Sequence, residues 1–173
     1  MITISKKVCL LGDFAVGKTS LVRRFVYSRF DDQYLSTIGV KVSRKTVVVP
    51  HPAQTEVVEL TMMLWDLAGG QEFDPVRSSY LRGVSGAVLV CDLCRAVTLN
   101  SLAVYAQELR KSNPAAQVII AANKADLTGQ HQLDTAQIER VAASLNAPYY
   151  LTSAKEGEAV EGLFRHLGRL LVG

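Results

Sequence analysis

The sequence lacks the marks of several protein classes. Lysine and arginine never occur more than two in a row, so the small net charge of +3 does not indicate a nucleic-acid-binding surface. There is also no signal peptide, no apolar stretch long enough to span a bilayer and no lipidation motif near the C-terminus. We therefore expect a cytoplasmic protein with no nucleic-acid partner and no lipid anchor in this chain.

Cysteine is scarce, and its spacing suggests no pairing. Cys9, Cys91 and Cys94 lie in or beside apolar runs, and an odd number of cysteines is more typical of a reducing compartment than of a disulfide scaffold. Cys91 and Cys94 have the C-x-x-C form, but no second pair of metal ligands accompanies them, so we expect two unrelated core thiols. The 173 residues, 49% apolar and 20% charged, have the composition of one globular domain over 1–173.

Short apolar runs alternate with longer stretches of helical period. The runs are VCLLG (8–12), GAVLVCDL (86–93), QVIIAAN (117–123) and PYYLTSA (148–154). Because each is nearly continuous, it is typical of a strand buried on both faces of a parallel sheet. Amphipathic helical patterns lie between the runs, at 21–26, 102–109, 138–145 and 160–171.

One stretch breaks this alternation. Residues 41–49 and 56–64 flank the turn-rich segment PHPAQT, and apolar residues alternate with polar ones in the second run. This pattern predicts a hairpin, so one strand should be antiparallel and at an edge of the sheet. The whole chain is predicted to form a doubly wound α/β domain with one antiparallel edge strand.

The first strand leads into GDFAVGKT, residues 12–19, which has the form G-x-x-x-x-G-K-[ST]. A phosphate chain needs inward-turned backbone N–H groups, so glycines allow close approach at this turn. The following helix N-terminus adds its dipole. Lys18 would then supply a charge to the β- and γ-phosphates, and Thr19 a hydroxyl to Mg²⁺.

Polar residues follow three other apolar runs. Asp66 ends a strand expected beside the phosphate loop, where it can orient Mg²⁺. In NKAD (123–126), a carboxylate can accept both the ring N–H and the exocyclic amino group of guanine, a donor pair that adenine lacks. TSAK (152–155) could present a backbone N–H to the base. Alone, each pattern also fits an ordinary turn or polar loop; together they favour a nucleotide site.

In this order, GDFAVGKTS, STIGV, WDLAGGQE, NKAD and TSAK resemble the motifs of the Ras superfamily of small GTPases, over essentially the whole chain. Residues 24–40 and 78–93 are most similar to the Rab branch. The resemblance implies a P-loop NTPase fold, the small G domain, with a mostly parallel six-stranded sheet and about five helices. It also implies a monomeric switch that binds GTP or GDP with Mg²⁺, hydrolyses GTP, and meets effectors, an activator and an exchange factor through switch regions 31–40 and 67–80.

The resemblance assigns roles by position. Thr19 and Thr37 would ligate Mg²⁺, and Asp66 would hold the ion through water. The Gly69 N–H would sense the γ-phosphate. The implied catalytic residues are Gln71, Lys18 and Thr37. The implied nucleotide-binding residues are Asp13, Phe14, Ala15, Val16, Gly17, Lys18, Thr19, Ser20, Phe30, Thr37, Gly69, Asn123, Lys124, Asp126, Ser153, Ala154 and Lys155; within this set, Phe30 would lie against guanine, Asp126 would read it, and the Ala154 N–H would meet its O6.

The chain departs from the family pattern around the γ-phosphate. Family members usually carry small residues, often glycine, where this chain has Phe14 and Ala15. They place glutamine directly after the γ-sensing glycine, whereas here Gly70 takes that position and Gln71 follows one residue late. One residue displaces a side chain by ~3.8 Å, and a 1 Å misplacement of a reacting group can cost ~10²-fold. We expect slow intrinsic hydrolysis and a poor response to an arginine-finger activator; alternatively, the loop rearranges so that Gln71 or an activator residue does this work.

Two other functions stay open from the sequence. The chain could be a hydrolytically impaired interaction module that holds GTP permanently. It could also be a P-loop kinase or ATPase, although NKAD with TSAK argues against ATP and no arginine-rich lid is visible. The hairpin over 41–64 is longer than is usual in the family, as expected for either a partner-binding projection or a tolerated insertion.

Overall fold

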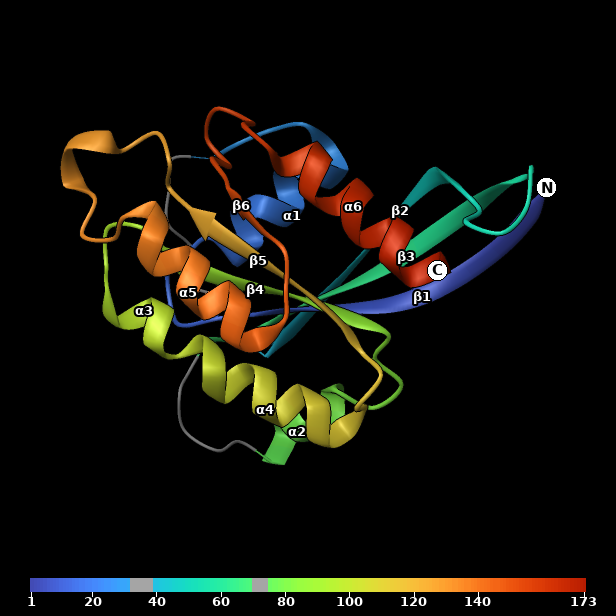
Figure 1. Ribbon diagram of the computed structural model, residues 1–173, viewed down its shortest axis with the longest axis horizontal. Helices are drawn as coiled ribbons and strands as arrows, with labels where there is room; N and C mark the ends of the chain where they lie inside the picture. Colours follow the sequence, from blue (N-terminus) through green and yellow to red (C-terminus); the bar gives the residue numbers. More distant parts are fainter. Residues whose placement is uncertain (32–38, 70–74) are drawn as a thin grey trace.

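The computed structural model describes residues 1–31, 39–69 and 75–173 of the chain (Figure 1). A six-stranded sheet has the order β2-β3-β1-β4-β5-β6. Its strands are β1 (Ile2–Leu11), β2 (Val40–Pro50), β3 (Val57–Leu67), β4 (Gly86–Asp92), β5 (Gln117–Asn123) and β6 (Tyr149–Leu151). Only the edge strand β2 is antiparallel to its neighbour among the described pairings. The predicted mostly parallel sheet with one antiparallel edge strand is therefore confirmed.

Helices cover both faces of the sheet (Figure 1). They are α1 (Lys18–Tyr27), α2 (Pro75–Tyr80), α3 (Val97–Asn100), α4 (Leu102–Ser112), α5 (Thr135–Leu145) and α6 (Val160–Val172), with a 3-10 turn, η1 (Thr128–Gln130). Only Ser101 separates α3 from α4, so the two can be counted as one helical segment. Counted in this way, the described part of the chain agrees with the expected number of about five helices. None of the described helices is long and apolar enough to cross a membrane.

Two hydrophobic cores lie on opposite faces of the sheet. Helices α1 and α6 pack on one face through residues such as Phe25 and Phe164, whose rings stack with centroids 4.1 Å apart. Helices α4 and α5 pack on the other face through residues such as Tyr105 and Ile138. Every residue of β4 is buried, as the continuous apolar run GAVLVCD predicted for a central strand covered on both sides.

The predicted hairpin forms, and its strands are longer than expected. Pairing runs from Val40 opposite Leu67 to Pro50 opposite Val57. Strand β1 also begins at Ile2, before the predicted run at 8–12, because its first residues pair in parallel with β3 from Val58 onward. These outer residues alternate in burial, so they lack the continuous apolar pattern by which the inner part of β1 was predicted.

The thiols differ from expectation at one position. Cys91 is buried and free, as predicted for a core thiol, and Cys9 is also buried and free. Cys94 is free but partly exposed, so its assignment to the core is wrong. The reason is that β4 ends at Asp92, which leaves Cys94 in the following turn.

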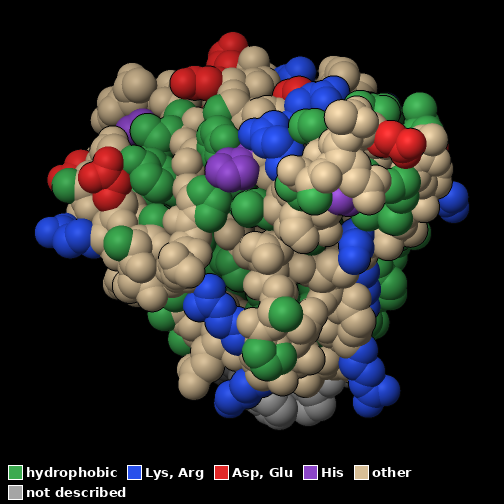
Figure 2. Space-filling model, turned by 45° about the vertical axis from the view of Figure 1, so that its right-hand side comes forward, with side chains coloured by type: hydrophobic (Ala, Val, Ile, Leu, Met, Phe, Trp, Pro, Cys, Tyr) green, Lys and Arg blue, Asp and Glu red, His purple; other side chains and the backbone are tan. Residues whose placement is uncertain are grey.

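Charged side chains occur in several separate places on the face shown in Figure 2, where lysine and arginine are interspersed with acidic and apolar groups. By contrast, the polar residues found by motif converge on one edge of the sheet. The carboxyl ends of β1, β3, β4 and β5 lie together there, with Leu10 opposite Asp66 and Asp92 opposite Asn123. In a doubly wound sheet this edge is where ligands bind.

Candidate nucleotide-binding site

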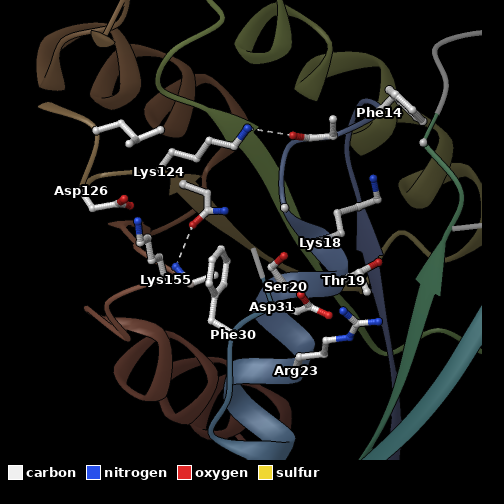
Figure 3. A pocket seen from close by; sticks show the side chains of 16 residues that line it. Phe14, Lys18, Thr19, Ser20, Arg23, Phe30, Asp31, Lys124, Asp126 and Lys155 are labelled. Atoms are coloured by element: carbon white, nitrogen blue, oxygen red, sulfur yellow. Dashed lines mark hydrogen bonds between the residues drawn. The ribbon is translucent and has the colours of Figure 1, made fainter. Parts of the chain in front are cut away.

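A pocket of about 340 Å³ opens at this edge, a size suited to a small-molecule ligand (Figure 3). Loops from both halves of the chain line it. The lining residues are Phe14, Ala15, Gly17, Lys18, Thr19, Ser20, Arg23, Phe30, Asp31, Gly69, Asn123, Lys124, Asp126, Leu127, Ala154 and Lys155. Thirteen of the sequence-predicted binding residues are therefore brought together around one cavity.

The phosphate-loop motif forms the turn between β1 and α1. Gly17, at the N-cap of α1, has a φ of 105°, which favours glycine. A Cβ on Gly17 would also lie 2.2 Å from Asn123 Nδ2, so a side chain cannot fit. Lys18 is 7% exposed, and its Nζ donates to the Gly12 and Asp13 carbonyls at 3.0 Å each. The lysine is thus held inside the loop that the motif predicted.

Burial also changes the acidity of this lysine. It lowers the pKa of Lys18 from 10.5 to about 8, while the nearby carboxylates of Asp66 and Asp13 act in the opposite direction. Arg95 and Arg77 lower this pKa further through their positive charge. A bound phosphate would reinforce the carboxylates and favour the charged lysine.

Thr19 and Asp66 form the candidate metal centre. The Thr19 hydroxyl donates a hydrogen bond to Asp66 Oδ2, and Asp66 is only 1% exposed. A hydroxyl and a carboxylate at the phosphate end of the pocket fit Mg²⁺, which binds hard oxygen ligands and completes its shell with phosphate and water. No cluster of three or more His, Cys, Asp or Glu that could hold a metal occurs in residues 1–31, 39–69 and 75–173. Thr37, the other predicted ligand, lies outside the described residues.

At the other end of the pocket, Asn123 connects three loops. Its Nδ2 donates to the Val16 carbonyl at 3.0 Å, and its Oδ1 accepts from Thr152 Oγ1 at 3.1 Å and from the Ala154 N–H at 3.3 Å. The Ala154 N–H, which we expect to meet O6 of the base, donates to Asn123 Oδ1 in this structure. Nearby, Asp126 Oδ1 accepts from Ser153 Oγ at 2.8 Å, which orients the carboxylate.

Asp92 is a buried carboxylate beside the pocket that sequence reasoning missed. It is 1% exposed, and its Oδ2 lies 2.8 Å from Lys124 Nζ and 3.3 Å from Arg95 Nε. Both cations also reach the phosphate loop, because Lys124 Nζ donates to the Ala15 carbonyl at 3.0 Å and an Arg95 amino group donates to the Phe14 carbonyl at 2.6 Å. Asp92 could have been found by its place at the end of an apolar strand, the same signal that identified Asp66.

Several predicted residues do not direct their side chains into the pocket. The Asp13 carboxylate turns toward α4, where it accepts from Ser101 Oγ at 2.6 Å and from Tyr105 Oη at 3.0 Å. Val16 is fully buried in a core, and Ser153 acts through Asp126. Phe30 both lines the pocket and packs against the core.

Gly69 packs directly against the phosphate loop. A Cβ on this residue would lie 2.5 Å from the Phe14 backbone nitrogen, so only glycine fits. The Phe14 side chain lines the pocket and remains 53% exposed. Gly70 and Gln71, which follow Gly69, lie outside the described residues, as do 32–38 in the first switch region and 72–74 in the second.

Comparisons with known proteins agree with this geometry. The Ras family profile matches residues 7–172. The chain is 35% identical over 173 residues to the GTP-binding protein ypt5 of Schizosaccharomyces pombe, covering 99% of this chain and 80% of that protein. It is 37% identical over 164 residues to mouse Ras-related protein Rab-22A, covering 94% and 81%. It is 32% identical over 159 residues to Ras-related protein Rab-1C of Dictyostelium discoideum, covering 91% and 76%. With a profile match over nearly its whole length and Rab proteins among its relatives, the chain belongs to the Ras family of small GTPases.

Proposed function

We propose that this chain is a guanine-nucleotide switch, acting as a single-domain monomer, whose GTP-bound form binds protein partners and whose reset by hydrolysis is slow. Members of its family are GTPases that bind GTP and GDP, generally with Mg²⁺, and that interact with effectors and regulators. The observation that carries the proposal is one pocket with Lys18 and the start of α1 at one end and Asn123 and Asp126 at the other. We assign partner binding to residues 31–40 and 67–80.

The phosphate end of the pocket suits a di- or triphosphate. The phosphate loop leads directly into the N-terminus of α1, whose dipole favours an anion, and Lys18 adds a positive charge that a phosphate stabilises. Thr19, Asp66 and Thr37 would hold Mg²⁺, which neutralises phosphate charge when bound. Gly69 lies against the phosphate loop, so its N–H is assigned to the γ-phosphate.

The other end of the pocket suits guanine. Asp126 is an acceptor whose orientation Ser153 sets, and it can take both guanine N–H donors. Phe30 offers an aromatic face to the base. Asn123 hydrogen-bonds both the phosphate loop and the base loop, so one ligand with a phosphate chain and a base can contact both ends of the pocket.

Slow hydrolysis is proposed from the register of the second switch. Gly69 packs tightly on the Phe14 backbone, which identifies it as the glycine at the phosphate loop. The residue directly after it is Gly70 rather than the glutamine of the family pattern. Gln71 then lies ~3.8 Å further along the chain. Phe14 adds bulk where a partner's arginine would enter.

Nucleotide identity tests the first part of this proposal. The protein purified in Mg²⁺ should carry GDP or GTP, identified by chromatography of the released nucleotide, and GTP that persists would favour the permanently loaded interaction module. Asp126→Asn should weaken GDP binding at least about 100-fold, because an amide cannot accept both guanine donors and its NH₂ opposes them. Glu158→Gln, which removes an exposed acid outside the pocket, should leave affinity within about twofold. Adenine nucleotide in the purified protein would instead support the kinase or ATPase function.

Single-turnover hydrolysis of bound GTP tests the second part. The wild-type rate should be about tenfold or more below that of a Rab protein whose glutamine directly follows the glycine. The double substitution Gly70→Gln/Gln71→Gly keeps composition and charge but restores the family order, and it should raise the rate by about tenfold or more. A wild-type rate equal to that of the Rab protein, lost in Gln71→Ala, would show that the loop rearranges to use Gln71.

A further inference from the structure

Arg23 is a cation of the pocket that no motif includes. It lies on α1 one helical turn after Thr19 and Ser20, so the three side chains share a face of the helix. Both of those residues and Arg23 line the cavity. Figure 3 shows the Arg23 side chain rising from α1 with its guanidinium beside Thr19 and Asp31.

The Arg23 guanidinium makes no hydrogen bond and no ion pair within residues 1–31, 39–69 and 75–173. Its neighbour in sequence behaves differently: Arg24 points to the other side, where Nε donates to the Ala154 carbonyl at 2.8 Å and an amino group donates to the Lys155 carbonyl at 2.6 Å. Arg24 therefore has a structural role in joining α1 to the base loop. Arg23, by contrast, presents its donors to the cavity.

A guanidinium in such a position has a preferred ligand. Its planar set of N–H donors matches the oxygens of a phosphate group, and charged hydrogen bonds of this type are short and strong. Lys18 approaches the cavity from the phosphate loop, where it is anchored on two carbonyls. Arg23 approaches from α1, beyond Ser20, so a phosphate chain bound in the cavity would meet the two cations at different points.

We propose that Arg23 is a second phosphate-binding cation of this site, in direct contact with the phosphate chain of the bound nucleotide. This inference rests on the proposed nucleotide-binding function. Asp31 is the acidic group of the pocket nearest to Arg23 in Figure 3, and it competes with the phosphate for the same guanidinium. Removal of the Asp31 charge should therefore not weaken nucleotide binding.

The test compares nucleotide affinity among matched variants. Arg23→Met keeps the length of the side chain and removes its charge, and we expect it to raise the Kd for GDP and for GTP by about 10- to 100-fold. Arg23→Lys keeps the charge without the planar donors and should recover part of this loss. Arg29→Met removes the same charge from an exposed residue that packs near Tyr27, outside the pocket, and should change Kd by less than about twofold.

Salt dependence separates a phosphate contact from a structural role. Loss of a direct contact should make the Kd for GDP less sensitive to KCl in Arg23→Met than in the wild type, and Arg23→Lys should restore the sensitivity. An Arg23→Met Kd within twofold of the wild type, or a loss of affinity with unchanged salt dependence, would overturn the assignment. If the wild type itself binds neither GDP nor GTP, the proposed function fails. If the wild type binds nucleotide and Arg23→Met binds it equally well, only this inference fails.

Discussion

At Lys18, burial and the neighbouring carboxylates act in opposite directions on the pKa of the ammonium group. Burial lowers the pKa to about 8, and the carboxylates of Asp66 and Asp13 raise it without offsetting the whole effect. Since the folded-state pKa lies below the unfolded value of 10.5, the charged lysine costs folding free energy below about pH 8. That cost is relieved as pH rises from about 8 to 10.5. A bound phosphate compensates the cost at neutral pH.

Because of this lowered pKa, the affinity for nucleotide should depend on pH. Because phosphate favours the charged lysine, GDP binding above about pH 8 should take up protons, and affinity should fall by up to about tenfold per pH unit. Calorimetry at pH 8.5 in two buffers of different ionisation enthalpy measures the uptake. Lys18→Arg, which stays charged, serves as the control because titration of guanine contributes equally to both proteins. Equal proton uptake by the two proteins would show that Lys18 is already charged before binding.

At the scale of elements, α2 is tied to α4, and α4 to the phosphate loop. Arg77 of α2 is 5% exposed and holds Glu108 of α4 with two hydrogen bonds, at 3.0 and 2.8 Å. The Arg77 Cζ also lies 5.2 Å from the centre of the Tyr105 ring, whose hydroxyl donates to Asp13. Through these contacts, the end of the second switch region has a defined position on the rest of the fold.

Breaking this ion pair should be costly. Glu108→Gln removes the carboxylate that accepts two hydrogen bonds from the buried Arg77, so we expect the free energy of unfolding to fall by about 3 kcal/mol. The comparison pair is Glu161 and Arg165 on α6, also 2.8 Å apart but half-exposed, where Glu161→Gln should cost less than about 1 kcal/mol. Urea unfolding at saturating GDP measures both variants. Equal losses would mean that burial adds nothing to the Arg77–Glu108 contact.

In the molecule as a whole, the hydrophobic cores and the pocket lie on different parts of the sheet. Its two faces are occupied by the hydrophobic cores, and its carboxyl edge carries the loops that line the pocket. The opposite ends of β2 and β3 extend away from this edge toward the N-terminus, as Figure 1 shows. The pairing of Val40 with Leu67 therefore joins the end of the first switch region to the start of the second, at the base of a long hairpin.

The sequence alone determined the fold class and the family, and its motifs identified residues that line both ends of the pocket. Continuous apolar runs predicted the inner strands, because a strand covered on both faces has no solvent side. The motifs identified the pocket residues because phosphate and base contacts depend on local geometry: a glycine turn, a helix start, and polar residues at strand ends. The capping box at the start of α5 is equally local, because the Asp134 carboxylate accepts from the Gln137 N–H and the Gln137 side chain accepts from the Asp134 N–H.

Only the tertiary structure decided where the remaining side chains point. Asp13 belongs to the phosphate-loop motif, yet its carboxylate binds residues of α4 far along the chain. Asp92 becomes the partner of Lys124 because the ends of the neighbouring strands β4 and β5 meet, and Arg23 enters the pocket because α1 turns that face toward it. These contacts join segments distant in sequence, and their formation depends on the packing of the whole sheet rather than on any local pattern.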